Sequence, residues 1–304
     1  MGPYDLSPVG PSCYSEAKGD SQMFDIHSHV LPGLDDGPAR IQDSLEMMRS
    51  AQRVGVRAIV ATPHCESHRR SLRASVIEDA VARLRAAAAA DPEASSVELH
   101  VGGEIMLDPG VRAALSAGDV PTLGGSTRFA LVELPMLEVP HYAEGVLFEL
   151  AATGYVPVLA HPERNHELSQ HFDVMLRMMK RGALMQLEAG SVVGAYGPIA
   201  QQCAIEMIDR RMCHFIASDA HRPGAYDALI PRAVEAVTAR IGPEAAAALF
   251  DANPAAALAD RKPSFPEPIG DDEWQELVSR QGPGEEGGRR RGRRSRARCP
   301  ILPQ

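Results

Sequence analysis

Residue types that commonly bind metal ions stand at the ends of seven short apolar segments of this 304-residue chain. The segments are 24–29, 58–64, 101–104, 131–133, 158–161, 184–188 and 215–221. A buried strand normally ends in turn residues, because charged groups gathered at strand ends are unfavourable unless they pair or bind a metal. The repeated His, Glu and Asp at these positions therefore predict an enzyme with a site for several metal ions.

Two of these segments carry potential ligands two residues apart. His27 and His29 form one pair, and Asp219 and His221 repeat the spacing in the last segment. Residues two apart in a strand point to the same face, so each pair can contact one metal ion. A lone histidine is more often structural than a ligand, but here eight candidates recur at strand ends. They are His27, His29, His64, Glu104, Glu133, His161, Asp219 and His221.

The types of these ligands restrict the chemistry. Mixed imidazole and carboxylate ligands favour Mn, Fe or Zn over Ca or Mg, and a set without thiolates argues against structural zinc. Carboxylates such as Glu104 and Glu133 can bridge two ions. Metal ions about 3.5–4 Å apart can activate a hydroxide and hold a phosphoryl group during in-line displacement. The chain also lacks a cysteine followed six residues later by arginine, a G-x-S-x-G turn and a phosphate-binding P-loop.

Further residues near the strand ends are candidates for contacts with phosphate. Arg164 lies three residues beyond His161, and a guanidinium can bind phosphate through two hydrogen bonds. The alternative is a surface ion pair with Glu163. Asp36 follows the first segment and is placed to hydrogen-bond a leaving group or a bound water, unless it only starts a helix. Weaker candidates for phosphate binding are Arg69, Arg70, Arg73 and Arg222.

The elements that must position these residues alternate along the chain. The apolar segments are short and continuous, as in parallel strands covered on both sides. Between them lie helical patterns at 44–54, 75–90, 109–117, 143–152, 174–181, 199–211 and 233–249. Strict alternation predicts an α/β fold. Seven strand–helix units favour a closed or nearly closed barrel over an open sheet, and in a barrel the carboxyl ends of the strands converge on one rim.

The two ends of the chain differ in composition from its centre. Residues 1–22 are rich in Gly, Pro and Ser and lack periodicity, and residues 263–304 are Pro-rich, then Gly- and Glu-rich, then Arg-rich. Both are predicted to be disordered, which leaves a single barrel domain at 23–262. Met23 directly precedes the first strand, so either Met1 or Met23 could be the start of translation.

Charge and cysteine content limit the function further. The net charge is −9, although residues 289–304 carry seven arginines and no acidic residue. The rest of the chain is therefore strongly acidic and a poor nucleic-acid binder. The five cysteines show no paired spacing, and we see neither a signal sequence nor an apolar stretch near 20 residues. These features predict a cytoplasmic protein.

The motifs follow one another in the order of a known family. They are H-S-H at 27–29, L-P-G-L-D-D-G-P at 31–38, A-T-P-H at 61–64, G-E-I at 103–105, V-E at 132–133, A-H-P-E-R at 160–164 and S-D-A-H at 218–221. Over about residues 23–260 the chain resembles the bacterial metal-dependent tyrosine-protein phosphatases of the PHP (polymerase and histidinol phosphatase) superfamily. The histidine pair alone is shared by many amidohydrolases, whereas the combination is specific.

The resemblance implies a distorted (β/α)7 TIM-like barrel of the PHP type, which binds three metal ions, usually Mn²⁺. It implies hydrolysis of phosphotyrosine, typically on an autophosphorylating bacterial tyrosine kinase that controls polysaccharide synthesis or export. The eight ligands match the family, with Arg164 and Asp36 on the phosphate side. Glu188 departs from the family, which often has Asn before the A-G-S stretch, and an extra carboxylate there is expected to change metal occupancy or substrate preference. The arginine usually found after S-D-x-H has no clear counterpart, although Arg222 or Arg232 could replace it.

Three other interpretations remain. One is a different PHP phosphomonoesterase, such as a histidinol-phosphate phosphatase, although the 31–38 and 160–164 motifs favour the tyrosine phosphatases. Another is a metal-binding regulator without turnover, against which the complete ligand set argues. The last is a protein that binds an anionic polymer or membrane weakly through its arginine-rich tail. The alternative to this interpretation is a tail that is solvated and binds nothing.

Overall fold

A computed structural model describes residues 22–66 and 72–281. The extension predicted at 1–22, except its last residue, and the arginine-rich run 289–298 lie outside the described residues. Arg69 and Arg70, two of the weaker phosphate-binding candidates, also lie outside them. Within the described part of the chain, no helix is both long and apolar enough to cross a membrane.

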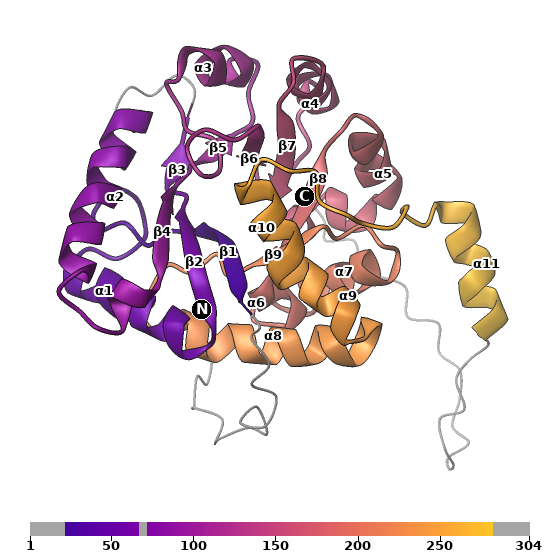
Figure 1. Cartoon of the computed structure of the whole chain (residues 1–304). Coiled ribbons are helices and arrows are strands. Elements are labelled where there is room, and N and C mark those ends of the chain that lie inside the picture. Colours follow the sequence, from indigo (N-terminus) through magenta and orange to yellow (C-terminus); the bar gives the residue numbers. More distant parts are fainter. Residues whose placement is uncertain (1–21, 67–71, 282–304) are drawn as a thin grey trace, which may run out of the picture.

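Parallel strands form the centre of the structure in two hydrogen-bonded groups, ordered β1-β2-β4 and β3-β5-β6-β7-β8-β9 (Figure 1). The bounds are β1 (Met23–Ser28), β2 (Val56–Ala61), β3 (His64–Cys65), β4 (Glu98–Val101), β5 (Glu104–Met106), β6 (Phe129–Glu133), β7 (Val156–Ala160), β8 (Leu184–Glu188) and β9 (Phe215–Ala217). The seven predicted strands are all present, and those at 58–64 and 101–104 are each divided in two.

Backbone contacts connect the two groups into one circular order. The interruption between β2 and β3 falls at Pro63, which has no N–H to donate, and Glu104 N bonds to the Pro63 carbonyl over 3.1 Å. Gly102 marks the matching interruption, where a Cβ would lie 2.5 Å from Val60 Cγ1. The first and last strands meet through His29 N to Ala220 O, at 2.9 Å. The expected seven-unit α/β arrangement is therefore present, with two of its strands broken.

Helices surround these strands (Figure 1). Their bounds are α1 (Ile41–Arg53), α2 (Ala74–Ala88), α3 (Val111–Ala117), α4 (Ala143–Ala152), α5 (Phe172–Lys180), α6 (Ala189–Val192), α7 (Pro198–Asp209), α8 (Ala225–Ile241), α9 (Pro243–Ala247), α10 (Asn253–Leu258) and α11 (Asp271–Gln281). Short 3₁₀ or π segments are η2 (Ala94–Ser96), η3 (Pro162–Arg164), η4 (Leu168–Gln170) and η5 (Ala248–Ala252). The helix predicted at 233–249 is wrong in its bounds, since α8 begins at Ala225 and runs through Pro231.

Two apolar clusters fill the structure, as expected for strands that are covered on both sides. The larger lies between strands and outer helices and includes Met47 of α1 and Leu147 of α4. The smaller joins residues of the strands themselves, among them Ile26, Phe129 and Phe215, to Ala257 of α10. Every residue of β6 and β8 is buried. The strand ends are consequently held rigidly by packing on both sides.

The segment after α10 corrects one prediction. Residues 263–304 were expected to be disordered, but 263–281 are described, contact the barrel through Phe265 and Ile269, and end in α11, whose side chains are mostly exposed. Ile269 is buried and its N–H bonds to the Arg210 carbonyl at 2.8 Å, while the Arg210 guanidinium pairs with Asp271 and lies 5.7 Å from the Trp274 ring. The proline-rich composition concealed this docking, which depends on partners far away in the sequence. Residues 282–304 lie outside the described part.

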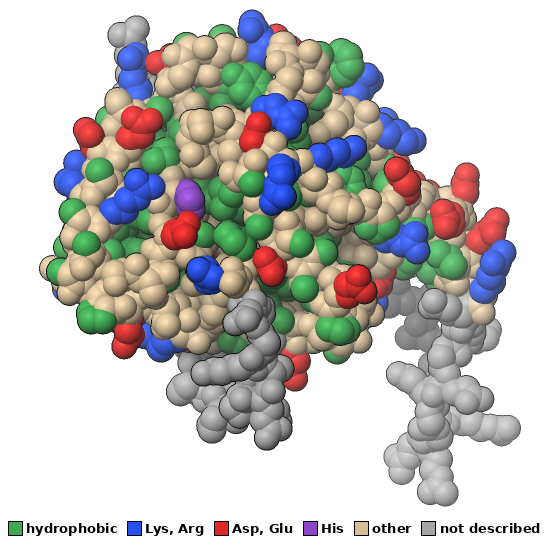
Figure 2. Space-filling view, viewed as in Figure 1, with side chains coloured by type: hydrophobic (Ala, Val, Ile, Leu, Met, Phe, Trp, Pro, Cys, Tyr) green, Lys and Arg blue, Asp and Glu red, His purple; other side chains and the backbone are tan. Residues whose placement is uncertain are grey.

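Charged groups on the surface are mixed. On the face shown in Figure 2, acidic and basic side chains are interspersed and do not form one large patch of a single sign. Arginines commonly lie beside carboxylates, as Arg53 does beside Asp227 at 2.8 Å. This face therefore offers no extended basic surface of the kind that binds nucleic-acid phosphates.

Candidate metal centre

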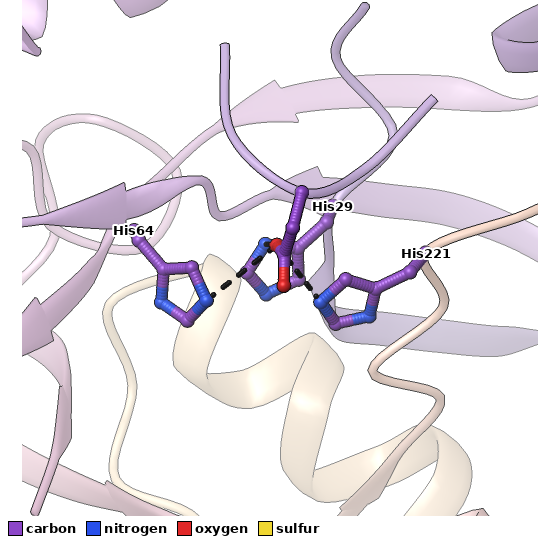
Figure 3. A group of neighbouring side chains, drawn as sticks. His29, His64 and His221 are labelled. Atoms are coloured by element: carbon purple, nitrogen blue, oxygen red, sulfur yellow. Dashed lines mark ion pairs between the residues drawn. The ribbon is translucent and has the colours of Figure 1, made fainter. Parts of the chain in front are cut away.

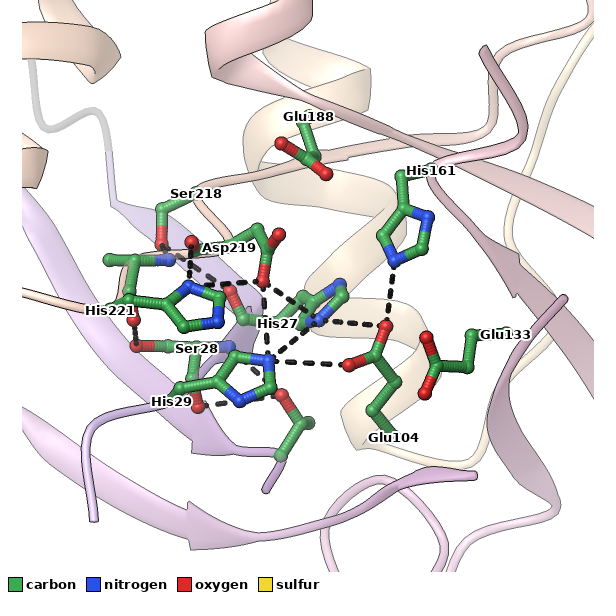
Figure 4. Close-up of polar contacts among 12 residues, drawn as sticks. His27, Ser28, His29, Glu104, Glu133, His161, Glu188, Ser218, Asp219 and His221 are labelled. Carbon is green, nitrogen blue, oxygen red and sulfur yellow. Dashed lines mark hydrogen bonds and ion pairs between the residues drawn. The ribbon is translucent and has the colours of Figure 1, made fainter. Parts of the chain in front are cut away.

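All eight predicted ligands lie together at the carboxyl ends of the strands; Figure 4 labels all of them except His64, which is labelled in Figure 3. Glu104 of β5 is in the middle. Its Oε1 lies 3.3 Å from His27 Nε2 and 2.8 Å from His161 Nε2, and its Oε2 lies 3.3 Å from His29 Nε2 and 2.9 Å from His64 Nδ1. One carboxylate thus contacts four imidazoles, which come from three different segments of the chain.

The eight residues and two others fall into four groups, of which the first three share members and the fourth is separate. In each group, one possible ligand atom from every member lies within 4.8 Å of the others. The groups are His29–Asp36–His64–His221, His27–His29–Glu104, His64–Glu104–Glu133 and His161–Glu188–Asp219. That these residues bind metal remains a prediction, but the fold brings together every one of them.

Two of the predicted ligands occupy unusual backbone conformations. His161 has φ of 34° and Asp219 has φ of 48°, in the left-handed region that residues other than glycine rarely adopt. His161 directly follows β7, and Asp219 lies two residues beyond the end of β9. Both positions are where the chain leaves the barrel. Such strain persists only where surrounding structure enforces it, and it is common at functional sites.

A second layer of polar residues orients the first histidine pair. Gln186 Oε1 lies 2.8 Å from His27 Nδ1, and Asp35 Oδ2 lies 2.7 Å from His29 Nδ1. When Nδ1 donates to such a partner, the lone pair of Nε2 is left facing the centre, the usual arrangement for a metal-binding imidazole. The sequence reasoning missed both residues, although a glutamine inside a buried strand and the paired D-D at 35–36 were available signals.

The loop after β1 is folded tightly against that strand. Gly37 N donates to Asp35 Oδ1 at 3.0 Å, and a Cβ on Gly37 would lie 2.2 Å from the His29 carbonyl oxygen. Only glycine permits this approach. The approach places the neighbouring Asp36 over the histidines.

Asp36 therefore has a position that the sequence did not specify. Its Oδ1 lies 3.2 Å from His221 Nε2 and 3.6 Å from His64 Nε2, two histidines that Figure 3 shows on either side of His29. The side chain is 65% exposed. Asp36 was predicted to hydrogen-bond a leaving group or water, and the geometry also allows it to be a metal ligand. We call Asp36, His64 and His221 the outer group, because their side chains are 30–65% exposed.

The remaining predicted ligands are buried, and we call them the inner group: His27, His29, Glu104, Glu133, His161 and Asp219. Beneath them, Asp25 joins β1 to the end of β9. This buried carboxylate accepts hydrogen bonds from Ser218 N at 2.9 Å, Ser218 Oγ at 2.5 Å and Tyr226 Oη at 2.6 Å. These bonds fix the two strands that carry the paired ligands.

Electrostatic interactions in the centre strongly favour positive charge. Burial alone would lower the pKa of His64 and His161, but hydrogen bonds with Glu104 outweigh it and raise the pKa of each to about 10. Burial would likewise raise the pKa of Glu104 and Asp219, yet neighbouring histidines, His27 first among them, hold the pKa of both well below its usual range. The carboxylates are thus ionised and attract protons or metal ions.

The donor set fits metal ions. Oε2 of Glu188 is shielded from solvent and accepts no hydrogen bond, and Oδ1 of Asp219, which is also shielded, lies 3.1 Å from His27 Nε2 and 3.2 Å from His29 Nε2. Nε2 of His27 and Nε2 of His29 face each other across 3.3 Å. Buried polar atoms without partners are unfavourable, and cations among them would satisfy both the carboxylate oxygens and the imidazole lone pairs.

Arg164, at the end of η3, lies at the edge of this centre rather than on the surface. Its Nη1 lies 2.6 Å from Glu188 Oε1 and 3.5 Å from Asp219 Oδ2, and its guanidinium stacks 4.3 Å from the centre of the Tyr196 ring. The alternative ion pair with Glu163 is not formed; Glu163 instead accepts a hydrogen bond from Glu188 N at 2.9 Å.

The other described arginine candidates lie farther out. Arg73 lies 3.7 Å from Asp119. Arg222 is exposed and lines a cavity of about 980 Å³ that adjoins the centre. The cavity wall includes Arg164, Asp219 and His221 on one side. Farther from the metal ligands it includes Met136, Leu137, Tyr196, Ile199, Arg222 and Arg232.

The family described as "Capsular polysaccharide synthesis, CpsB/CapC" matches residues 23–259. The chain belongs to this family. Tyrosine-protein phosphatase YwqE of Bacillus subtilis is 34% identical over 203 residues, which are 66% of this chain and 77% of YwqE. The putative tyrosine-protein phosphatase CapC of Staphylococcus aureus is 35% identical over 199 residues, with the same shares of the two chains.

A solved structure of this family confirms the predicted fold class. It comes from a study of YwqE from Bacillus subtilis and CpsB from Streptococcus pneumoniae, described as unique metal-dependent tyrosine phosphatases. The TM-score is 0.76 at 30% sequence identity, over 81% of this chain and 98% of that one. The resemblance inferred from the motifs is thereby confirmed as well.

Proposed function

We propose that this CpsB/CapC family protein is a metal-dependent protein-tyrosine phosphatase. The observation that carries the proposal is the cluster of imidazoles around Glu104 with Arg164 at its edge, open to a cavity on one side. The names of its relatives and its family support the same activity. The described residues include no nucleophilic cysteine candidate, since Cys65, Cys203 and Cys213 are buried and burial raises the pKa of each thiol.

The inner and outer groups are the residues that would hold the metal ions. Manganese is the proposed metal, with iron or zinc as alternatives, because mixed imidazole and carboxylate donors suit these ions. Three ions are proposed, as the resemblance implies. When bound, they would supply positive charge to the phosphoryl oxygens and activate water for in-line attack at phosphorus.

Arg164 is proposed to bind the phosphate of the substrate. Both of its contacts with carboxylates use Nη1, and a guanidinium carries five N–H donors in a planar fork. The remaining donors can bind phosphoryl oxygens beside the ligands Asp219 and His221. Stacking on Tyr196 keeps the plane of the guanidinium fixed, which favours contacts that form in the transition state.

Asp36 is proposed to act at the solvent side of the centre. Its carboxylate completes the outer group with His64 and His221, and it is also exposed where water and the leaving group must pass. It can therefore hydrogen-bond an attacking water or the departing phenol oxygen. Arg69 and Arg70, which lie outside the described residues, are proposed as phosphate contacts on the sequence alone.

The adjoining cavity supports a protein substrate rather than a small metabolite. Leu137 is 77% exposed and Ile199 is 66% exposed on its wall, and exposed apolar side chains around a catalytic centre commonly bind other molecules. A phosphotyrosine ring is long enough to reach the metal ligands while the peptide stays in this cavity. An autophosphorylating bacterial tyrosine kinase involved in polysaccharide synthesis is the proposed partner, and the cytoplasm is the proposed location.

The test compares three substrates at equal metal content: a phosphotyrosine peptide, the matching phosphoserine peptide and histidinol phosphate. The phosphotyrosine peptide should have the highest kcat/KM, because a phenol is a better leaving group than an alkanol and the longer side chain reaches deeper. Each rate is measured with Mn²⁺ and after removal of metal by a chelator. A preference for histidinol phosphate would reject the tyrosine-phosphatase function, and activity that survives thorough chelation would reject metal dependence.

A further inference from the structure

Glu188 ends β8 with its side chain fully buried beside the inner group (Figure 4). It lies in one group with His161 and Asp219, whose possible ligand atoms are all within 4.8 Å of one another. In contrast to Glu104, which contacts four imidazoles, Glu188 has a carboxylate oxygen without any hydrogen-bond partner. That oxygen, Oε2, is shielded from solvent.

The arginine at the edge of the site does not account for this carboxylate completely. Arg164 Nη1 lies 2.6 Å from Glu188 Oε1 and 3.5 Å from Asp219 Oδ2, so one guanidinium serves two buried carboxylates. When both carboxylates are ionised, they carry one negative charge more than the arginine alone can balance. Buried carboxylates in proteins are usually paired or bound to a metal, which leaves a cation as the missing partner.

We propose that Glu188 is an additional metal ligand. Its Oε2 binds the ion shared by His161 and Asp219, while its Oε1 pairs with Arg164. The inference rests on the metal centre of the proposed function and adds to it a ligand that connects metal and arginine. One imidazole and two carboxylates form a donor set suited to Mn²⁺, Fe²⁺ or Zn²⁺. Because β8 is buried along its whole length, the carboxylate is held in place before metal binds.

The connection has a consequence for substrate binding. A carboxylate that binds a cation through one oxygen and a guanidinium through the other fixes the position of the guanidinium relative to the ion. Arg164 and the metal would then approach the phosphate as one rigid unit. Loss of Glu188 should weaken metal binding and also release Arg164, whereas loss of Arg164 should leave the metal in place.

The test measures metal content without any substrate. Wild-type protein and the Glu188→Gln variant, which keeps the size of the side chain but removes its charge, are dialysed against buffered Mn²⁺ and analysed by mass spectrometry for bound metal. Glu188→Gln should hold one ion fewer or bind one ion about 10- to 100-fold more weakly, the range typical of disturbed metal sites. Unchanged stoichiometry and affinity would overturn the proposal.

Two further variants separate this role from the alternatives. Arg164→Gln removes the other partner of Glu188 and should retain wild-type metal content, so metal loss of equal size there would show that Glu188 acts only through the arginine. Glu163→Gln is the matched control, since Glu163 is equally buried in the same region but belongs to none of the four groups; it should retain its metal.

If Glu188→Gln does not fold, Glu188→Asp keeps the charge with a shorter reach and should show the same weakened binding. Normal metal binding by Glu188→Asp would then reject the proposal.

These outcomes are independent of the proposed activity. A wild-type protein that binds metal through Glu188 but fails to hydrolyse phosphotyrosine would reject the function and retain the ligand. If the wild-type protein hydrolyses phosphotyrosine but its Glu188→Gln variant keeps all its metal, the proposed function is retained and Glu188 is rejected as a ligand.

Discussion

The inner and outer groups of the metal centre are built differently. Inner residues such as His27 and Glu104 are at most 1% exposed, whereas Asp36 in the outer group is 65% exposed. The inner pair His27 and His29 is oriented by Gln186 and by Asp35 at hydrogen-bonding distance.

The outer histidines have weaker support from the rest of the protein. His221 Nδ1 lies 2.8 Å from the backbone carbonyl of Asp219 and 3.7 Å from its Oδ1, and the His221 ring stacks on His29 at 4.0 Å. A buried ligand set with a second layer keeps a metal ion bound and excludes water. An exposed set without such a layer permits exchange with solvent and contact with substrate. We therefore expect the inner group to retain metal and the outer group to hold an ion that is lost more easily.

The largest effect that tests this comparison is expected from Glu104, which contacts four histidines. Glu104→Ala should remove most bound metal and lower turnover by about 10²-fold or more, because both metal binding and metal catalysis are lost. His221→Ala should release only the outer ion. Metal content and p-nitrophenyl phosphate hydrolysis are measured for both variants. Equal metal loss in the two variants would show that the centre behaves as one unit and that the distinction between groups has no consequence.

Folding of the metal-free variants needs a control. The Glu104→Ala substitution also removes the partner of several buried histidines, so its unfolding temperature is compared with that of chelated wild-type protein. A variant that unfolds at a similar temperature to the chelated wild type has lost metal and not its fold.

The sequence predicted the positions of the eight ligand candidates better than the position of Asp36, and the reason is physical. Inner ligands such as His27 and Glu133 end or immediately precede the end of buried apolar strands, so their position follows from strand pattern alone. Asp36 lies in a loop, and its approach to His221 depends on the tight turn at Gly37. Loop geometry of this kind is set by tertiary contacts, which periodicity does not reveal.

Second-layer residues were harder still to recognise. Gln186 contacts His27 across 159 positions of the sequence, and no local pattern separates it from a glutamine that simply tolerates burial. The docking of α11 was missed for the same reason, because Arg210 and Asp271 are paired only by the fold. Glu188, by contrast, was noticed as an unusual residue, but its unpartnered oxygen is a feature of the structure alone.

A second expected effect lies at the boundary between inner ligands and substrate. Arg164→Ala should lower kcat/KM for a phosphotyrosine peptide by roughly 10²-fold, or about 2–3 kcal/mol, as expected when a charge-assisted contact with the transition state is lost. Metal content and the unfolding temperature of the metal-loaded protein should change little, because cations can balance Glu188 and Asp219. Steady-state kinetics, bound-metal analysis and thermal unfolding provide the three measurements. Loss of metal together with activity would make Arg164 part of the inner structure and not a substrate contact.

The smallest expected effect concerns the cavity wall beyond the outer group, where Arg222 directly follows His221. If Arg222 contacts the peptide around the phosphotyrosine, Arg222→Ala should lower kcat/KM for a peptide with acidic flanking residues by about two- to fivefold, since exposed ion pairs contribute up to about 1 kcal/mol. Hydrolysis of p-nitrophenyl phosphate, which has no flanking residues, should remain near the wild-type rate. Added salt should reduce the difference between the two proteins, because exposed charges are screened. Arg57→Ala, at an exposed position in β2, is the control for a general loss of positive charge. Equal losses for the peptide and for p-nitrophenyl phosphate would instead place Arg222 on the phosphate itself, beside Arg164, and would extend the phosphate-binding site from the inner ligands to the outer rim.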